Sequence, residues 1–197
     1  LDMIGTTLSL MGEYDAAQAF YGRANTRRPD HPPFMQNLAN NLVYQGDSDG
    51  AQRIFQRIIE LQPDSPQSHW GLSSARRAAD STHIEQMRAL QAGHRDNPRA
   101  RAFYLYAIGK ECEDLQAWEE AFEAFAAGAA ARRSSVDYDE AAEAAMFEQL
   151  EQAYDQAWLD APGSGDPDPS PIFVLGQPRT GTTLIERIIG SHSQVHA

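Results

Sequence analysis

The sequence predicts a mainly α-helical fold, a solenoid of helical hairpins followed by the first strand, loop and helix of an α/β domain. Three observations predict it. Small, aromatic and proline residues recur every 34 positions over much of the chain. A stretch rich in proline, glycine and aspartate then interrupts the pattern at 161–170. A β-branched and aromatic run follows, and a glycine-bounded loop and an apolar helical pattern come directly after it.

The repeat is visible in five pairs of residues that match in type, as small, small, small, aromatic and proline. The pairs are Gly5 and Ala39, Gly12 and Gly46, Ala17 and Ala51, Tyr21 and Phe55, and Pro29 and Pro63. Helix-turn-helix packing explains the pattern. Small residues let two helices approach closely, the aromatic ring fills the space beside them, glycine permits the turn, and proline ends the unit.

Two further copies of the repeat are predicted after the first two. One is clear, with Gly109, Ala121 and Phe125 at the small and aromatic positions. The copy between begins near Trp70 and is degenerate, because serines replace the expected apolar and small residues. Those serines are Ser73 and Ser74, and the apolar residues of its second helix are Ile84, Met87 and Leu90. We expect Cys112 and the tryptophans Trp70, Trp118 and Trp158 to be core residues.

These units resemble the tetratricopeptide repeat, in about four copies over residues 1–133 with the third degenerate. The resemblance implies a protein-interaction module that binds a protein or peptide on the concave surface of the solenoid. The polar candidates for that surface are Asn37, Asn40, Asn41, Arg76 and Arg77. The alternative is that these are ordinary solvated polar side chains.

A capping helix is predicted over 134–160, with a linker at 161–170 and a separate fragment at 171–197. Apolar residues recur in this helix at three- and four-residue spacing, among them Met146, Leu150 and Trp158. We expect the helix to cover the open end of the solenoid, which otherwise exposes apolar surface.

Charge and composition exclude several classes of protein. The net charge is −12, and residues 111–168 hold 16 acidic side chains against 2 basic ones. Such acidity argues against a nucleic-acid partner, because that binding depends on Lys and Arg neutralising phosphates. No apolar run approaches the ~20 residues of a membrane helix, so we expect no membrane partner. The single cysteine excludes a disulfide scaffold and fits a cytoplasmic protein.

The last part of the chain carries the predicted chemistry. Residues 172–175 read as a buried parallel strand, Gly176–Thr183 as a loop, and the apolar residues after Thr183 as a helix. Backbone amides of such a loop converge on an anion, and the helix dipole adds to the attraction. The glycine spacing equals that of a nucleoside-triphosphate loop, but Thr182 stands where that loop needs lysine. ATP or GTP hydrolysis is therefore disfavoured, and the cation of the loop is Arg179.

The segment from Pro171 to His192 resembles the 5′-phosphosulfate-binding loop of sulfotransferases that use 3′-phosphoadenosine 5′-phosphosulfate (PAPS). It looks most like the tyrosylprotein and the bacterial tetratricopeptide-fused branches. The resemblance implies that Arg179 is catalytic and pairs with the donor, and that the loop binds PAPS without a metal. The residues it assigns to the donor are Arg179, Thr180, Gly181, Thr182 and Thr183.

The resemblance also implies a cytoplasmic, bacterial-type enzyme that moves a sulfuryl group to an acceptor hydroxyl, on a protein or peptide presented by the repeats. The catalytic base and the 3′-phosphate segment are expected after Ala197, so we expect the chain to be inactive by itself. Three alternatives stay open: a non-enzymatic tetratricopeptide scaffold, a nucleotide kinase or NTPase, and an enzyme acting on a small molecule or glycan. In the last of these the repeats would serve homo-oligomerisation.

Overall fold

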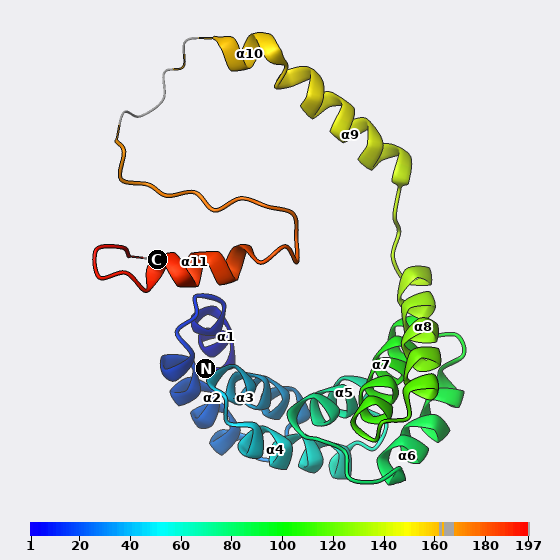
Figure 1. Ribbon diagram of the computed structural model, residues 1–197. Coiled ribbons are helices and arrows are strands. Elements are labelled where there is room, and N and C mark those ends of the chain that lie inside the picture. The colour runs from blue at the N-terminus through cyan, green and yellow to red at the C-terminus, as the bar shows by residue number, and fades with distance from the viewer. Residues whose placement is uncertain (162, 164–167, 197) are drawn as a thin grey trace. The chain divides into compact units, whose positions relative to one another are not determined.

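The structure is a computed structural model that describes residues 1–161, 163 and 168–196. It divides into two compact units, Leu1–Tyr138 and Asp139–Ala197. Unit 1 is built from helices that follow one another as hairpins along an arc, with α1, α3, α5 and α7 on its inner side (Figure 1). Its helices are α1 (Asp2–Leu10), α2 (Tyr14–Arg27), α3 (Pro32–Gln45), α4 (Ser48–Leu61), α5 (Pro66–Ala75), α6 (Thr82–Gln91), the 3₁₀ turn η1 (Ala92–His94), α7 (Pro98–Asp114) and α8 (Trp118–Ser134).

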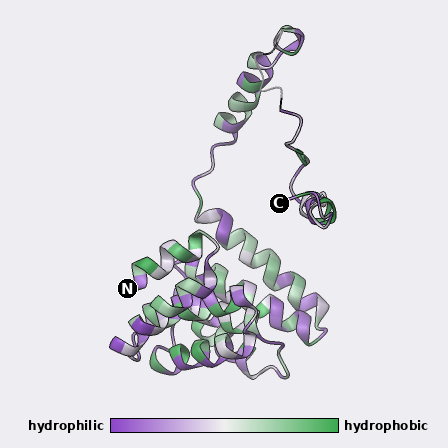
Figure 2. Cartoon of the chain, turned by 90° about the vertical axis from the view of Figure 1, so that its left-hand side faces the viewer, coloured by the Kyte–Doolittle hydropathy of each residue, from purple (hydrophilic) through white to green (hydrophobic). Residues whose placement is uncertain are grey.

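Small residues lie where the paired helices approach each other closely, as the repeat predicts. A Cβ on Gly5 would lie 2.8 Å from the ring of Tyr21, and one on Gly109 would lie 2.7 Å from the ring of Phe125. The alanines at the other small positions are buried. Gly46 ends α3 with φ of 83°, a left-handed conformation that glycine adopts without strain. Figure 2 shows hydrophobic and hydrophilic residues along each helix of unit 1, as expected for helices with one buried side.

The third unit departs from a regular hairpin. Helix α6 packs mainly against α7 and η1, while α5 packs against α4 and α7. Ser73, at the small position of this copy, is fully buried and donates a hydrogen bond to Glu111 Oε1 at 2.9 Å. The degenerate sequence of this unit therefore reflects a buried polar contact in place of an apolar one.

The predicted long helix of residues 134–160 is broken, and this corrects the sequence analysis. Helix α9 (Glu140–Ala153) ends just before α10 (Gln156–Asp160). The break occurs because the carboxylate of Asp155 accepts the Trp158 N–H at 2.8 Å and so starts a new helix as its N-cap. Covering of the solenoid by this helix stays a prediction.

Two of the expected core tryptophans are exposed, which is a second correction. The exposed fraction is 61% for Trp118 and 55% for Trp158, whereas Trp70 is half-buried. Trp118 begins α8, the last helix of unit 1, so no further hairpin of that unit covers it. Cys112 is buried in the core with Ile84 and Met87, which confirms its predicted role.

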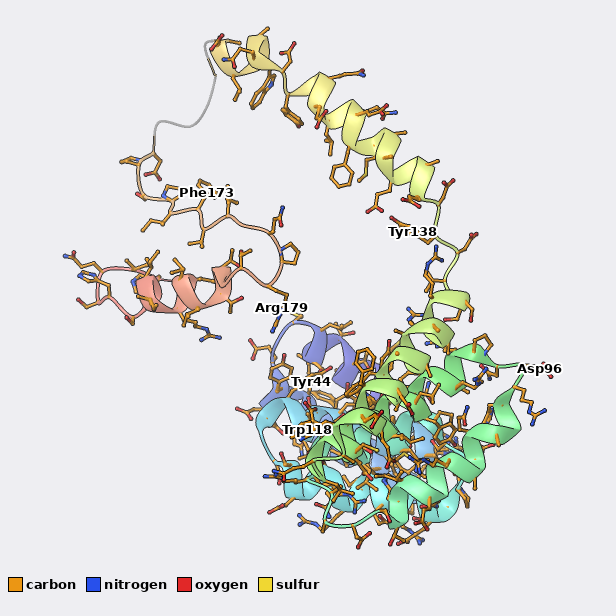
Figure 3. All side chains as sticks on the ribbon, turned by 45° about the vertical axis from the view of Figure 1, so that its right-hand side comes forward. Tyr44, Asp96, Trp118, Tyr138, Phe173 and Arg179 are labelled. Carbon is orange, nitrogen blue, oxygen red and sulfur yellow. The ribbon has the colours of Figure 1, made fainter. Side chains whose placement is uncertain are left out.

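The predicted strand at 172–175 does not form. The described residues contain no strand, and the side chains of Ile172, Phe173 and Leu175 are exposed in an extended segment before α11 (Thr182–Gly190) (Figure 3). The physical reason is that a parallel strand is stable only when it is hydrogen-bonded to neighbouring strands. Within the described parts of the chain, no helix has the length and apolar character needed to cross a membrane.

Candidate functional site

The loop before α11 closes tightly around Gly176. A Cβ at this position would lie 2.7 Å from Thr180 Oγ1 and 2.9 Å from Thr182 Cγ2. Both distances are shorter than real Cβ contacts, so a larger residue at position 176 would have to displace the side chains of Thr180 and Thr182. Thr180 holds the turn from the other side, because its backbone N–H and its hydroxyl both donate to the Gln177 carbonyl, at 3.2 and 2.7 Å. The loop is therefore curled by its own hydrogen bonds and close packing.

Two residues of the loop have positive φ angles. Gly181, the N-cap of α11, has φ of 95°, and Arg179 has φ of 70°. A non-glycine residue in the left-handed region is uncommon, and such residues concentrate at functional turns. The unusual backbone at Arg179 turns the chain directly before the helix, and its guanidinium is exposed (Figure 3).

The start of α11 offers free hydrogen-bond donors. The first hydrogen bond of this helix runs from Ile185 N–H to the Gly181 carbonyl at 3.0 Å. The amides of Thr182, Thr183 and Leu184 have no carbonyl partner within the helix, and the helix dipole makes this end electropositive. The structure thus brings the sequence-predicted residues, from Arg179 to Thr183, into one exposed turn. Such a turn can hold an anion through amides, hydroxyls and one guanidinium.

A second candidate site lies in unit 1, between α5, α7 and α8. It is a pocket of about 280 Å³ lined by Trp70, Arg99, Ala102, Phe103, Tyr106 and Arg132. The rings of Trp70 and Tyr106 meet edge to face with their centres 6.2 Å apart. Both arginine side chains are exposed. The pocket combines an aromatic wall with two cations, which suits an anionic partner that also carries apolar groups.

The polar residues predicted for the concave surface differ in how far they are buried and in which residues they bond to. Asn41 is buried, and its Nδ2 donates to the Tyr14 carbonyl and to Gln18 Oε1, each at 3.0 Å. Its predicted role in binding a peptide, and the alternative of a solvated side chain, are therefore both wrong. Asn37 donates to the Asp2 carboxylate at 3.0 and 3.1 Å, while Asn40 is exposed.

Sequence reasoning missed a buried polar cluster in the third unit. It contains His69 of α5, His83 of α6 and Glu111 of α7, besides Ser73. Burial lowers the pKa of His69. Burial opposes ionisation of Glu111 as well, but its hydrogen bonds to His83 and Ser73 and the charge of Arg76 lower its pKa overall. The sequence did hold a signal for this cluster, because polar residues stand at positions that the repeat assigns to the core.

Comparisons with known proteins match two separate parts of the chain. Residues 8–74 match the tetratricopeptide repeat family, and residues 171–197 match the sulfotransferase family. A solved thermophilic TPR protein of Thermus thermophilus superposes with a TM-score of 0.51 at 24% identity, covering 66% of this chain and 71% of that one. Unit 1 has the tetratricopeptide-repeat fold.

One further solved structure and one further protein sequence are similar to this chain. A MamA RS-1 double mutant superposes with a TM-score of 0.50 at 16% identity, covering 65% of this chain and 71% of that one. An uncharacterized protein of Aquifex aeolicus (strain VF5) is 27% identical over 174 residues, which are 88% of this chain. The chain spans 23% of the length of that relative.

Proposed function

We propose that this chain is part of a cytoplasmic PAPS-dependent sulfotransferase, with a tetratricopeptide module that binds a protein or peptide. One observation carries the proposal. The sulfotransferase match falls on residues 171–197, the segment in which a glycine-closed loop presents the free amides of a helix N-terminus. A loop of this kind suits the 5′-phosphosulfate end of PAPS, which presents anionic oxygens to amides and to a guanidinium.

Each residue of the turn has a role in this proposal. Arg179 pairs with the phosphosulfate and stabilises the charge that grows on the bridging oxygen as the sulfur–oxygen bond of the donor breaks. The amides of Gly181 and Thr182 hold the 5′-phosphate, and the hydroxyls of Thr182 and Thr183 add two donors. The Thr180 amide, which the resemblance also assigns to the phosphate, is already bonded to the Gln177 carbonyl and shapes the turn instead. The acceptor hydroxyl forms the new bond to sulfur, in line with the leaving phosphate, and its proton passes to a general base outside this turn. The proposal assigns no metal to this turn.

The competing use of such a loop is nucleoside-triphosphate hydrolysis. That chemistry draws much of its charge neutralisation from a lysine directly after the second glycine. Thr182 occupies that position, and the cation of the loop lies before Gly181 rather than after it. One guanidinium and a few amides match one phosphosulfate better than a triphosphate.

Calorimetry with 3′-phosphoadenosine 5′-phosphate, the product of the donor, tests the proposal on the full-length protein. Arg179→Ala removes a charge-assisted hydrogen bond, so the dissociation constant should rise about 10- to 100-fold. Arg187→Ala is the matched control, because Arg187 is an exposed arginine in the last turn of α11, the helix that follows Arg179. Equal affinities of wild type and Arg179→Ala would refute the assigned role. No heat of binding to the wild type would favour a non-enzymatic scaffold.

The pocket of unit 1 supports the second half of the proposal. Its two arginines line it together with aromatic rings, and Arg132 and its neighbour Arg133 lie in the last turn of α8, after three glutamates. We propose that it binds an acidic peptide with a large apolar side chain, as a substrate or as a partner. Fluorescence anisotropy with a labelled peptide of this type tests it. Arg99→Glu should abolish binding, whereas Arg53→Glu on α4 should leave it unchanged, and equal effects of the two variants would refute the site.

A further inference from the structure

Three ionisable side chains form a continuous buried chain across α5, α6 and α7. His69 Nε2 contacts the Pro63 carbonyl at 2.8 Å, and His69 Nδ1 contacts His83 Nε2 at 2.8 Å. His83 Nδ1 then contacts Glu111 Oε1 at 2.7 Å. His69 and Glu111 are fully buried, and the exposed fraction of His83 is 8%. All three distances are hydrogen-bond distances, so each contact needs one proton between its two atoms.

Counting protons along the chain gives a definite result. The Pro63 carbonyl can only accept, so His69 Nε2 carries a proton. The contact between the imidazoles needs a second proton and the contact to Glu111 a third. Two neutral imidazoles and a carboxylate supply only two protons in total. The chain of His69, His83 and Glu111, here called the histidine chain, is therefore complete only when it holds one additional proton.

The surroundings place the negative charge on Glu111 and the additional proton on the imidazoles. Glu111 Oε1 also accepts from the Ser73 hydroxyl at 2.9 Å and lies 3.5 Å from Arg76 Nη2. Hydrogen bonds from His83 and Ser73, together with the nearby charge of Arg76, favour the carboxylate. The other charged or titratable groups facing the histidine chain are Asp64, which lies on the Pro63 side, and Tyr104 and His94, which both hydrogen-bond to Asp64 at 2.7 Å.

The histidine chain lies where unit 1 is least like a regular repeat. Helix α6 packs mainly on α7, and the hydrogen bond between His69 and His83 ties it to α5. Removing the additional proton leaves two lone pairs facing each other at one of the contacts, and adding another places two N–H groups against each other. Either change costs free energy at a buried site.

We propose that one shared proton on the histidine chain holds α6 against α5 and α7, so that the third hairpin is a pH-sensitive joint of the solenoid. The joint is closed near neutral pH. It loosens when the shared proton is lost and also when a second proton enters.

Glu111→Gln tests the proton count. A glutamine amide nitrogen at the Oε1 position donates one N–H to His83 Nδ1 and the other to the Ser73 hydroxyl, so the variant completes the chain with two neutral imidazoles. The folded wild type then holds one proton more than the folded variant. The ratio of their unfolding constants, wild type over variant, should therefore rise tenfold per pH unit between about pH 5 and pH 8. Glu113→Gln, the same change at an exposed position of α7, should give a flat ratio. A flat ratio for Glu111→Gln would overturn the proposal.

Two measurements on the wild type keep the proposal testable if the variant does not fold. Nitrogen-15 NMR of the imidazoles should show one additional proton shared by His69 and His83 at neutral pH, and two neutral rings would overturn the proposal. Cys112, the single cysteine, is buried beneath α6 with Ile84 and Met87. Its labelling by a thiol reagent, corrected for the thiolate fraction, should accelerate above neutral pH before the far-ultraviolet circular dichroism changes. A constant corrected rate up to global unfolding would contradict the joint.

Discussion

Replacing Gly71 of α5 by alanine tests the close packing of neighbouring units. A Cβ there would lie 2.5 Å from two ring atoms of Phe55 and 2.9 Å from a third. Phe55 is 1% exposed and is packed in the core with Ala39, Ala51 and Leu72, so its ring has little room to move. Overpacking of this kind costs about 1–3 kcal/mol. The gain in helix propensity from glycine to alanine offsets about 0.5–1 kcal/mol of it.

The expected result is a net loss of about 1–2 kcal/mol for Gly71→Ala. At Gly109 the added Cβ meets the half-buried ring of Phe125 at 2.7 Å, so the loss should be smaller. Gly22→Ala in α2 is the control. Nothing lies within 4 Å of its Cβ position, so helix propensity alone applies there. Gly22→Ala should therefore stabilise the protein by about 0.5–1 kcal/mol.

Urea unfolding followed by circular dichroism measures all three changes, with a midpoint that shifts while the slope stays constant. In thermal melts the same differences correspond to about 2–4 °C per kcal/mol for a chain of this size. If Gly71→Ala were as stable as Gly22→Ala, the ring of Phe55 would not be held against α5. The second and third units would then pack less closely at Gly71 than the structure shows.

Three further predictions concern single positions. Gly176→Ala should weaken binding of 3′-phosphoadenosine 5′-phosphate at least tenfold by opening the loop, and unchanged calorimetric affinity would contradict the closed turn. Asp47→Ala removes the cap that accepts the Gly50 N–H at 2.9 Å, so unfolding should show a loss of about 1 kcal/mol. Burial opposes ionisation of Asp114, but Lys110 and the Ala78 amide lower its pKa overall. The ionised Asp114 carboxylate therefore stabilises the folded state above the ordinary aspartate pKa. This stabilisation is lost as the pH falls through the lowered pKa of the folded state. Asp114→Asn should flatten that part of an acid unfolding curve.

The regular units were predictable because their packing depends on residue size at fixed spacing. Gly5 against Tyr21 and Gly109 against Phe125 follow directly from the 34-residue repeat. Gly71 against Phe55 was missed, because that contact joins one unit to the next and no spacing within a unit reveals it.

Polar contacts and ends of helices were less predictable. Whether Ser73 or Glu111 is buried depends on a partner on another helix, 38 residues away for this pair. The break at Asp155 was missed because the apolar spacing continues through it, whereas one carboxylate bonded to the Trp158 amide decides the boundary. The prediction of a strand at 172–175 was wrong for a different reason. A sequence shows strand propensity, but strand formation needs neighbouring strands to supply hydrogen bonds.

Transfer of radiolabelled sulfur from PAPS tests the central claim most directly. Full-length protein would be incubated with sulfur-labelled PAPS and candidate acceptors that carry hydroxyl groups, with Arg179→Ala and Arg187→Ala assayed in parallel. The account predicts labelled product with wild type and Arg187→Ala, and at least a tenfold lower rate with Arg179→Ala. Labelled product formed equally fast by Arg179→Ala, or a folded wild type that neither binds nor consumes PAPS, would contradict it.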